Sequence, residues 1–470
     1  MENKGSQTTW TADALQQAYR ALAGREQEFR VVSNPEELEQ LEREIRGHTD
    51  TLARLLLQKQ VQASLETDAH KAKEAELIAR WPGTMKNEGY ETVHIRTATG
   101  VSIPIRARYY RCVDKRPPAT RHKGVYAGLA VLGVHERCTP LLGAMVSSWS
   151  ALLGSFEEVR QVLSEQGVEL GVKVLRLITY RYAERARAMQ QVEHFALGPG
   201  ESVAGRRVVV SCDGGRIRLR EYKRGRKTPK GRRRYRGAWR EPKLLIIYVV
   251  DPEGRLDKTF PPVIDGCLQG PDALFRLIQA YLVTLKVHEA EKVLFVADGA
   301  HWIWKRTPGL VQTLGLNAEQ VHELIDFYHA VEHLGKVAAL RKSWTVKERQ
   351  AWIRKHRRLL MRGKFEQVVK AVEGLCRGRH SKALTTEREY FAQNRHRMAY
   401  DRLKALQLPV GSGAVESAVR RVINLRMKGP CIFWGKENAD NMLMLRAYYK
   451  AGRWEVLKRM ANSPLSLLST

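Results

Sequence analysis

The chain has 470 residues, in which 80 Lys and Arg oppose 50 Asp and Glu, for a formal net charge of +30. This length predicts roughly two to four domains. So large a positive charge is typical of proteins that bind a polyanion, with DNA or RNA as the first candidates, although a basic protein without such a partner stays open. The six cysteines include no C-x-x-C pair, which argues against a disulfide framework and for a reducing compartment.

No apolar run approaches the roughly 20 residues that cross a bilayer, and the first residues lack the apolar core of a signal peptide. These features predict a protein of the cytoplasm, without a membrane partner.

Residues 1–85 are predicted to form a mostly helical N-terminal region. A helix start is expected at Asn34, which can cap a helix whose first turn holds Pro35 and Glu37. Apolar residues then follow with an approximate spacing of three and four. That stripe fits either a short coiled coil or a helix face that packs on its own protein.

Residues 86–200 are predicted to form a small β-hairpin followed by a DNA-binding region of the helix-turn-helix type. Apolar and polar residues alternate on both sides of Thr99-Gly100, as in a hairpin. Ser155 and Glu158 predict a capping box, Gly167 a helix end, and a basic helix follows to about Arg187. An ordinary helical hairpin is the alternative. A zinc site at Cys112 and Cys138, with His135 nearby, stays open although the ligands are sparse.

Residues 201–329 follow a short linker, Leu197-Gly-Pro-Gly-Glu-Ser202, and change to β patterns. Strands are predicted at 207–212, 216–222, 243–250 and 292–297, with a helix at about 272–285 before the last. The order β-β-β-α-β predicts an α/β RNase H-like domain, a mixed five-stranded sheet with flanking helices. Residues 330–405 are predicted to be a helical insertion, and 406–470 the last part of that domain with C-terminal helices.

A dense run of positive charge lies between the second and third of these strands. From Arg216 to Lys243, fourteen of twenty-eight residues are Lys or Arg, and glycines and aromatic residues interrupt them. We interpret this segment as a mobile basic hairpin that contacts phosphates, with a solvated charged loop as the alternative. The residues predicted to contact DNA here, on the basic helix and near the last domain are Lys173, Arg176, Arg181, Arg224, Arg226, Lys227, Lys230, Arg232, Arg233, Arg234, Arg236, Trp302, Arg426 and Lys428.

Three acidic residues stand where catalysis is expected. Asp213 and Asp298 each end an apolar strand and precede glycine, and Glu416 lies in the first turn of a helix that Gly411-Ser-Gly413 opens. A carboxylate at the end of a buried strand is costly unless it binds a cation or is strongly paired. Together, the three are predicted to hold two Mg²⁺ or Mn²⁺ ions, which suits hydrolysis and transfer of phosphodiesters. A single Asp-Gly, by contrast, is usually only a turn.

Several motifs together resemble the DDE transposases of bacterial insertion sequences, closest to the ISKra type and distantly the Mutator-like elements. They are Asp298-Gly-Ala-His-Trp-Ile-Trp304, Asp326-Phe-Tyr-His329, Gly411-Ser-Gly-Ala-Val-Glu416, Arg426-Met-Lys-Gly429 and Trp434. The resemblance covers residues 200 to 450 and implies a transposase that binds double-stranded element ends, as at least a dimer on DNA, and cuts and joins strands. It assigns the metal ligands to Asp213, Asp298 and Glu416, and the D-x-x-H motif to Asp326 and His329.

Some roles and functions stay open at this point. His329 is a candidate for orienting a phosphate or assisting proton transfer, and equally for a core histidine paired with a carboxylate. Trp302 can stack on an unpaired base or pack in the core. Two other functions compete: a DNA-binding protein descended from a transposase but without catalysis, and an RNase H-like nuclease without strand transfer.

Overall fold

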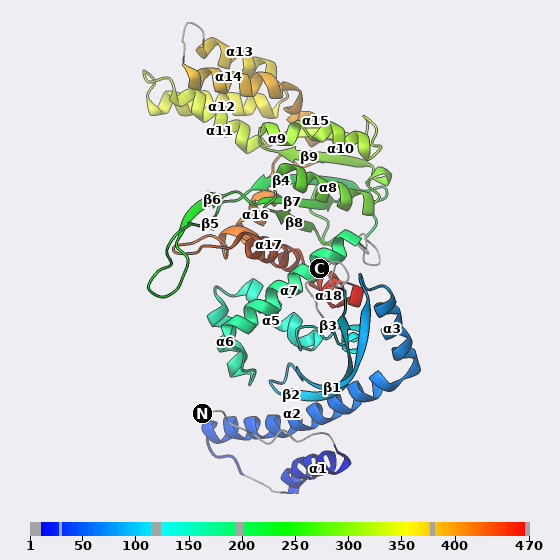
Figure 1. Cartoon of the computed structure of the whole chain (residues 1–470). Coiled ribbons are helices and arrows are strands. Elements are labelled where there is room, and N and C mark those ends of the chain that lie inside the picture. Colours follow the sequence, from blue (N-terminus) through cyan, green and yellow to red (C-terminus); the bar gives the residue numbers. More distant parts are fainter. Residues whose placement is uncertain (1–10, 28–30, 115–123, 193–200, 377–380, 466–470) are drawn as a thin grey trace. The chain divides into compact units, whose positions relative to one another are not determined.

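The computed structural model describes residues 11–27, 31–114, 124–192, 201–376 and 381–465. The chain divides into two compact units (Figure 1): unit 1 comprises residues 1–192 and 455–470, and unit 2 comprises residues 193–454. The division lies near the boundary expected at residue 200, and most of the expected linker lies in 193–200, outside the described residues. The expected last domain, 406–470, is split after Trp454, because the residues that follow make their contacts with unit 1. Among the described helices, none has the length and apolarity to cross a membrane.

Unit 1 is built of helices around one small antiparallel sheet. Its elements are α1 (Ala12–Gln27), α2 (Pro35–Glu66), α3 (Asp68–Ala79), β1 (Met85–Arg96), β2 (Ser102–Cys112), β3 (Gly124–Val125), α4 (Ala127–Val131), α5 (Pro140–Leu152), α6 (Phe156–Glu165), α7 (Val172–Val192) and most of α18 (Trp454–Asn462). The predicted start of α2 is confirmed, because the Asn34 side chain accepts a hydrogen bond from the Glu37 amide at 2.8 Å.

The predicted hairpin is confirmed as β1 and β2, which pair antiparallel across the turn that contains Gly100. This pairing excludes a zinc site shared by Cys112 and Cys138. Cys138 bridges to Arg96, which pairs with Ser102 at the start of β2, whereas Cys112 ends β2. At the rise of an extended strand, the two thiols lie about 30 Å apart.

The predicted pair of helices in unit 1 is also present. Ser155 caps α6 by accepting from the Glu158 amide at 3.1 Å, and Gly167 ends the turn with φ 79°. The capping box was wrong in its second half, because the Glu158 carboxylate accepts from the Gly154 amide rather than from Ser155. α7 is longer than expected, and it packs on α5 and α6 through buried residues that include Leu175.

Unit 2 contains two sheets and a run of helices. Its elements are β4 (Arg207–Gly214), β5 (Ile217–Tyr222), β6 (Tyr235–Arg240), β7 (Lys243–Val250), β8 (Val263–Cys267), α8 (Pro271–Thr284), η1 (Val287–Glu289), β9 (Lys292–Ala297), α9 (His301–Trp304), α10 (Thr307–Thr313), β10 (Val321–Ile325), α11 (Phe327–Ala339), α12 (Val346–Met361), α13 (Phe365–Cys376), α14 (Lys382–Asn394), η2 (Arg395–Arg397), α15 (Tyr400–Ala405), α16 (Gly413–Val419), η3 (Arg420–Asn424) and α17 (Lys436–Lys450).

The main sheet of unit 2 is mixed and five-stranded, in the order β10-β9-β4-β7-β8. β4, β9 and β10 run parallel, and β7 is antiparallel to both of its neighbours. The expectation of a mixed five-stranded sheet in an α/β unit is therefore confirmed. Its membership was partly wrong: residues 216–222 belong instead to a separate hairpin of β5 and β6, and β8 and β10 complete the sheet.

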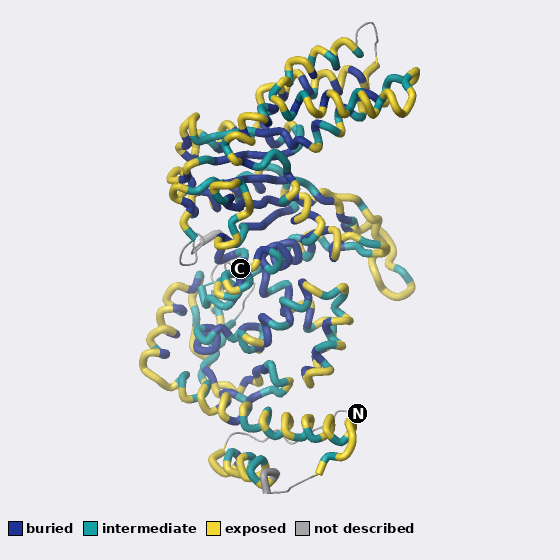
Figure 2. Tube along the Cα trace, turned by 180° about the vertical axis from the view of Figure 1, so that it is seen from behind, coloured by how far each residue is buried: buried dark blue, intermediate teal, exposed yellow. Residues whose placement is uncertain are grey.

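Helices cover the sheet, and the expected helical insertion follows it. β7 and β8 are buried along their whole length, under α8, α16 and α17. Figure 2 shows this contrast, with buried tube through the sheet and exposed tube along the hairpin of β5 and β6. Helices α11 to α14 pack against one another, and the part of 330–405 that is described contains no strand.

Candidate active site

The parallel strands bring three acidic residues to one edge of the main sheet. In the pairing of β4 with β9, Ser211 lies opposite Val296, so the same offset sets Asp213 level with Asp298. In the pairing of β9 with β10, Ala297 lies opposite Ile325, so the next residue, Asp326, shares that level. Neighbouring strands lie about 4.8 Å apart. The three acids therefore form a row at the carboxyl ends of the parallel strands.

Asp213 lies at the end of β4, beside two glycines against which other parts of unit 2 pack closely. A Cβ added at Gly214 would lie 1.9 Å from a Glu241 carboxylate oxygen, and one at Gly215 would lie 2.6 Å from the Ile423 side chain. The two glycines thus admit protein neighbours rather than leaving open space. Burial raises the pKa of Asp213, the Gly214 amide at 2.6 Å partly opposes this, and the negative charge of Asp298 adds to the rise.

Asp298 is fixed by the loop that follows β9. Its side chain accepts from the Ala300 amide at 3.0 Å, and its carbonyl oxygen accepts from the Trp304 indole at 2.7 Å. A Cβ at Gly299 would lie 2.2 Å from the ring of Tyr390 on α14. The helical insertion therefore reaches the row of acids and packs directly on the loop of the second one.

Asp326 connects the end of β10 to the start of α16. One carboxylate oxygen caps α11 by accepting from the His329 amide at 2.8 Å, and the other accepts from the Ser412 amide. Burial alone would raise the pKa of Asp326, but the groups of His329 and Ser412 lower it to about 2. Both carboxylate oxygens therefore accept hydrogen bonds from backbone amides, and the bond to Ser412 fixes the position of the start of α16.

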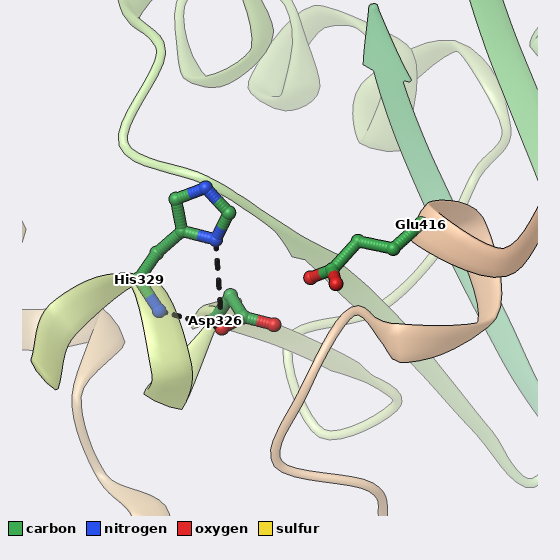
Figure 3. A group of neighbouring side chains, drawn as sticks. All are labelled: Asp326, His329 and Glu416. Atoms are coloured by element: carbon green, nitrogen blue, oxygen red, sulfur yellow. Dashed lines mark hydrogen bonds and ion pairs between the residues drawn. The ribbon is translucent and has the colours of Figure 1, made fainter. Parts of the chain in front are cut away.

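Glu416 approaches the row from α16, which packs on β4 and β7. Its carboxylate, the Asp326 carboxylate and the His329 ring each offer an atom within 4.8 Å of the others, and Figure 3 shows the three side chains converging. Glu416 also accepts from the Ser412 hydroxyl at 3.1 Å. The Asp326 carboxylate, 3.7 Å from Nδ1 of His329, raises the pKa of His329 to about 9.

The electrostatics of this edge favour a cation. Asp298, His329 and Glu416 all act on the pKa of Asp213, so four charged groups share one region. In the part of the chain that the structure describes, neither Asp213, Asp298 nor Glu416 forms an ion pair with Lys or Arg. Carboxylates that gather without such partners are costly, and a divalent cation with oxygen ligands offsets that cost. Among the described residues, the ligand-type atoms that lie within 4.8 Å of one another belong to Asp326, His329 and Glu416, and Asp213 and Asp298 are not part of that group.

The predicted DNA contacts fall into three groups. The predicted cations from Arg224 to Arg236 lie on the hairpin of β5 and β6, and all of them are exposed. Lys173 and Arg176 on α7 and Lys428 after η3 are exposed as well. Arg181 is half-buried and pairs with Glu184 at 2.9 Å. Arg426 and Trp302 differ from the expectation. Arg426 is buried beside the Trp434 ring, and Trp302 packs edge-to-face on Phe275 at 6.3 Å.

Two residues at this edge were missed by the sequence reasoning. Tyr390 lies in a polar helix with no catalytic motif, so nothing in its surroundings indicated contact with Gly299. Lys243 begins β7 opposite Gly214, and its buried ammonium lies 2.7 Å from Glu241 and 4.3 Å from the centre of the Trp302 ring. A lysine at the start of an apolar strand was the available signal for it.

Comparison of the chain with protein families, with curated proteins and with solved structures gives no match.

Proposed function

We propose that unit 2 is an RNase H-like catalytic domain and that the protein is a DNA transposase, which cuts and joins DNA phosphodiesters. The observation that carries the proposal is the row of acids at one sheet edge, level by strand register and faced by Glu416. The mixed five-stranded sheet is compatible with that fold. The motifs from Asp298 to Trp434 add the resemblance to insertion-sequence transposases.

Asp213, Asp298 and Glu416 are the proposed ligands of two Mg²⁺ or Mn²⁺ ions. Such ions, when bound, supply activation of a water or a DNA 3′-hydroxyl and stabilisation of the leaving oxygen. The protein side chains do the positioning. Asp326 holds the start of α16 through the Ser412 amide, so the direction of Glu416 depends on it. His329 carries a positive charge at neutral pH and balances part of the negative charge of the row.

The basic hairpin supports DNA as the substrate. The loop from Lys223 to Arg234 carries eight Lys or Arg among twelve residues and no acid, and its side chains are mostly exposed. A polyanion neutralises this charge, and phosphate contacts of this kind give affinity without sequence preference. Base-specific contacts would have to come from elsewhere, and α7 with its exposed Lys173 and Arg176 is the candidate. Joining of two element ends implies at least a dimer on DNA.

The first test is cleavage of the DNA that flanks the coding sequence in its source genome, cloned in a supercoiled plasmid. The wild type is compared with Asp213→Asn, Asp298→Asn and Glu416→Gln in Mg²⁺, in Mn²⁺ and in EDTA. We expect metal-dependent nicking and joining by the wild type, and a loss of at least 100-fold in each variant, in line with the several kcal/mol that metal catalysis supplies. DNA affinity is expected to stay within about twofold, since the changes leave the basic hairpin intact.

The outcomes separate the three functions. Cleavage without joining would favour a nuclease, and binding without cleavage by the wild type would favour a DNA-binding descendant. Variants that cut as well as the wild type would overturn the assigned ligands. A matched control is Asp251→Asn. It replaces a half-buried carboxylate in the loop between β7 and β8, which pairs with Arg255 at 3.4 Å, and should leave cleavage unchanged.

A further inference from the structure

The hairpin of β5 and β6 has two chemically different faces. Strand pairing sets Arg218 opposite Trp239, Arg220 opposite Gly237, and Tyr222 opposite Tyr235. Because successive residues of a strand point to opposite sides, these residues share one face. The ring of Phe433 joins them, since a Cβ at Gly237 would lie 2.3 Å from it. We call this set the aromatic face: Arg218, Arg220, Tyr222, Tyr235, Trp239 and Phe433.

The opposite face serves the fold. Ile217 and Leu219 on that side are buried. Glu221 on the same side pairs with Arg236 at 2.7 Å and also with Arg240. The two aliphatic residues and the one acid of β5 therefore lie on the face opposite the aromatic face, and the aromatic face carries no acid.

On the aromatic face, rings and one guanidinium group contact one another in a continuous row. Arg218 lies between Trp239 at 5.4 Å and Phe433 at 4.5 Å, both measured to the ring centroid. Tyr235 contacts Phe433 edge-on at 5.5 Å and Tyr222 at 6.2 Å. Tyr222, Tyr235 and Trp239 are nevertheless 55%, 40% and 47% exposed. These three large rings add little to the core, so their surface is available to a ligand.

The chain segment from Gly429 to Trp434 is hydrogen-bonded to the strand that carries the row. The free edge of β5 pairs with Trp434. The Arg220 amide donates to the Trp434 carbonyl at 2.8 Å, and the Trp434 amide donates to the Arg218 carbonyl at 2.9 Å. The Arg218 guanidinium donates to the Gly429 carbonyl at 2.7 Å. A hairpin of two strands alone is only marginally stable. These contacts anchor the aromatic face to the chain segment that begins at Glu416.

We propose that the aromatic face binds unpaired nucleotides of DNA by stacking on the bases, while the adjoining basic loop binds their phosphates. Every base offers a π-face to aromatic rings and to arginine, but only an unpaired base leaves that face accessible. A β-ribbon that reads a duplex uses hydrogen-bonding side chains toward base edges, whereas this face presents ring surfaces. The assignment to DNA rests on the proposed function and adds to it a contact with a single-stranded segment beside the cleaved bond.

The test measures binding of the full-length protein to a fluorescein-labelled twelve-residue oligothymidylate and to a twelve-base-pair duplex by fluorescence anisotropy, at one fixed salt concentration. The variants are Trp239→Ala and Tyr235→Ala, with Trp239→Phe as the conservative change and Lys227→Ala as the charge control. Circular dichroism verifies folding, which exposed positions should not disturb.

Each alanine variant is expected to weaken oligothymidylate binding about tenfold or more, as loss of one stacked base does, and to change duplex binding less than twofold. Trp239→Phe should restore most of the affinity. Lys227→Ala should weaken both ligands by similar factors, because phosphates are common to both. Equal losses on both ligands in the alanine variants, or no loss on either, would overturn the inference. Binding of oligouridylate tenfold tighter than oligothymidylate would overturn the assignment to DNA.

These outcomes are separable from failure of the proposed function. Asp298→Asn should bind oligothymidylate like the wild type, because Asp298 is not part of the aromatic face. If no DNA is ever cut but Trp239→Ala still loses single-strand affinity, the aromatic face stands and the transposase proposal fails. If DNA is cut normally and the aromatic variants bind as the wild type does, the inference alone fails.

Discussion

Removal of the Asp326 carboxylate should destabilise unit 2 far more than loss of an ordinary helix cap. Asp326 is fully buried, and its two oxygens accept from the His329 amide and from the Ser412 amide. Hydrogen bonds to a buried charged group contribute about 1.5–3 kcal/mol each, and truncation leaves both amides unpaired. Asp326→Ala should therefore cost about 3–5 kcal/mol. Asp326→Asn keeps one acceptor oxygen but sets an NH₂ group against an amide donor, so it should cost about half as much.

The assay is thermal unfolding followed by circular dichroism at pH 7 in EDTA, which removes any contribution from bound metal. For a unit of this size, about 3–5 kcal/mol corresponds to a decrease of about 10 °C in the transition that belongs to unit 2. The matched control is Thr345→Ala, which removes an exposed cap of α12 in the same unit and should cost about 1 kcal/mol. If Asp326→Ala melts within 2 °C of the control, the carboxylate does not clamp α16 and the reasoning is refuted.

Three further predictions concern the same unit. His329→Gln should remove a pH dependence of the thermal stability measured in EDTA. The pKa of His329 in the folded protein is about 9, above its ordinary value, so the charged ring stabilises the native state below about pH 6.5 and loses this effect as the pH rises through 9. Equal melting curves for the variant and the wild type at pH 6 would contradict this. Gly299→Ala should lower both stability and cleavage because its Cβ meets Tyr390, and Tyr390→Ala should restore stability in the double variant; additive losses in a double-mutant cycle would argue against contact. Arg453→Ala should cost about 3–5 kcal/mol in urea unfolding, since Arg453 is buried against Glu201 at 2.9 Å, and a change below 1 kcal/mol would be inconsistent with that pairing.

The strands that carry the first two acids were predictable because their sequence patterns are local. Residues 207–212 and 292–297 are short apolar runs that end at Asp-Gly, and a fully buried parallel strand needs little else. The start of α2 was predictable for the same reason, since Asn34 and Pro35 act within one turn. Site residues that depend on such local rules were found without the structure.

The missing strands lacked a local pattern of this strength. β10 contains His322 and Glu323 among its five residues because it is an edge strand of the sheet, so its pattern is only partly apolar. β6 is rich in arginine and lies in the segment that was interpreted as a mobile basic hairpin, but its own bounds were not predicted, because its pairing with β5 decides its conformation. Asp326 follows Leu324 and Ile325 at the end of β10 and had the signal of a strand-end acid. Its level with Asp213 and Asp298 depends on register, which no single segment specifies.

β8 shows why such a signal needs its surroundings before it indicates a site. Asp265 follows Val263 and Ile264 and precedes glycine, as Asp213 and Asp298 follow their own apolar runs. Yet the Asp265 carboxylate is fully buried and accepts from the Tyr281 hydroxyl at 2.7 Å and from the Gly266 amide at 2.7 Å. A helix side chain thus satisfies this acid, so it needs no cation. The same local pattern therefore gives a structural residue under α8 and a candidate ligand in the row of acids, and packing of the neighbouring elements makes the difference.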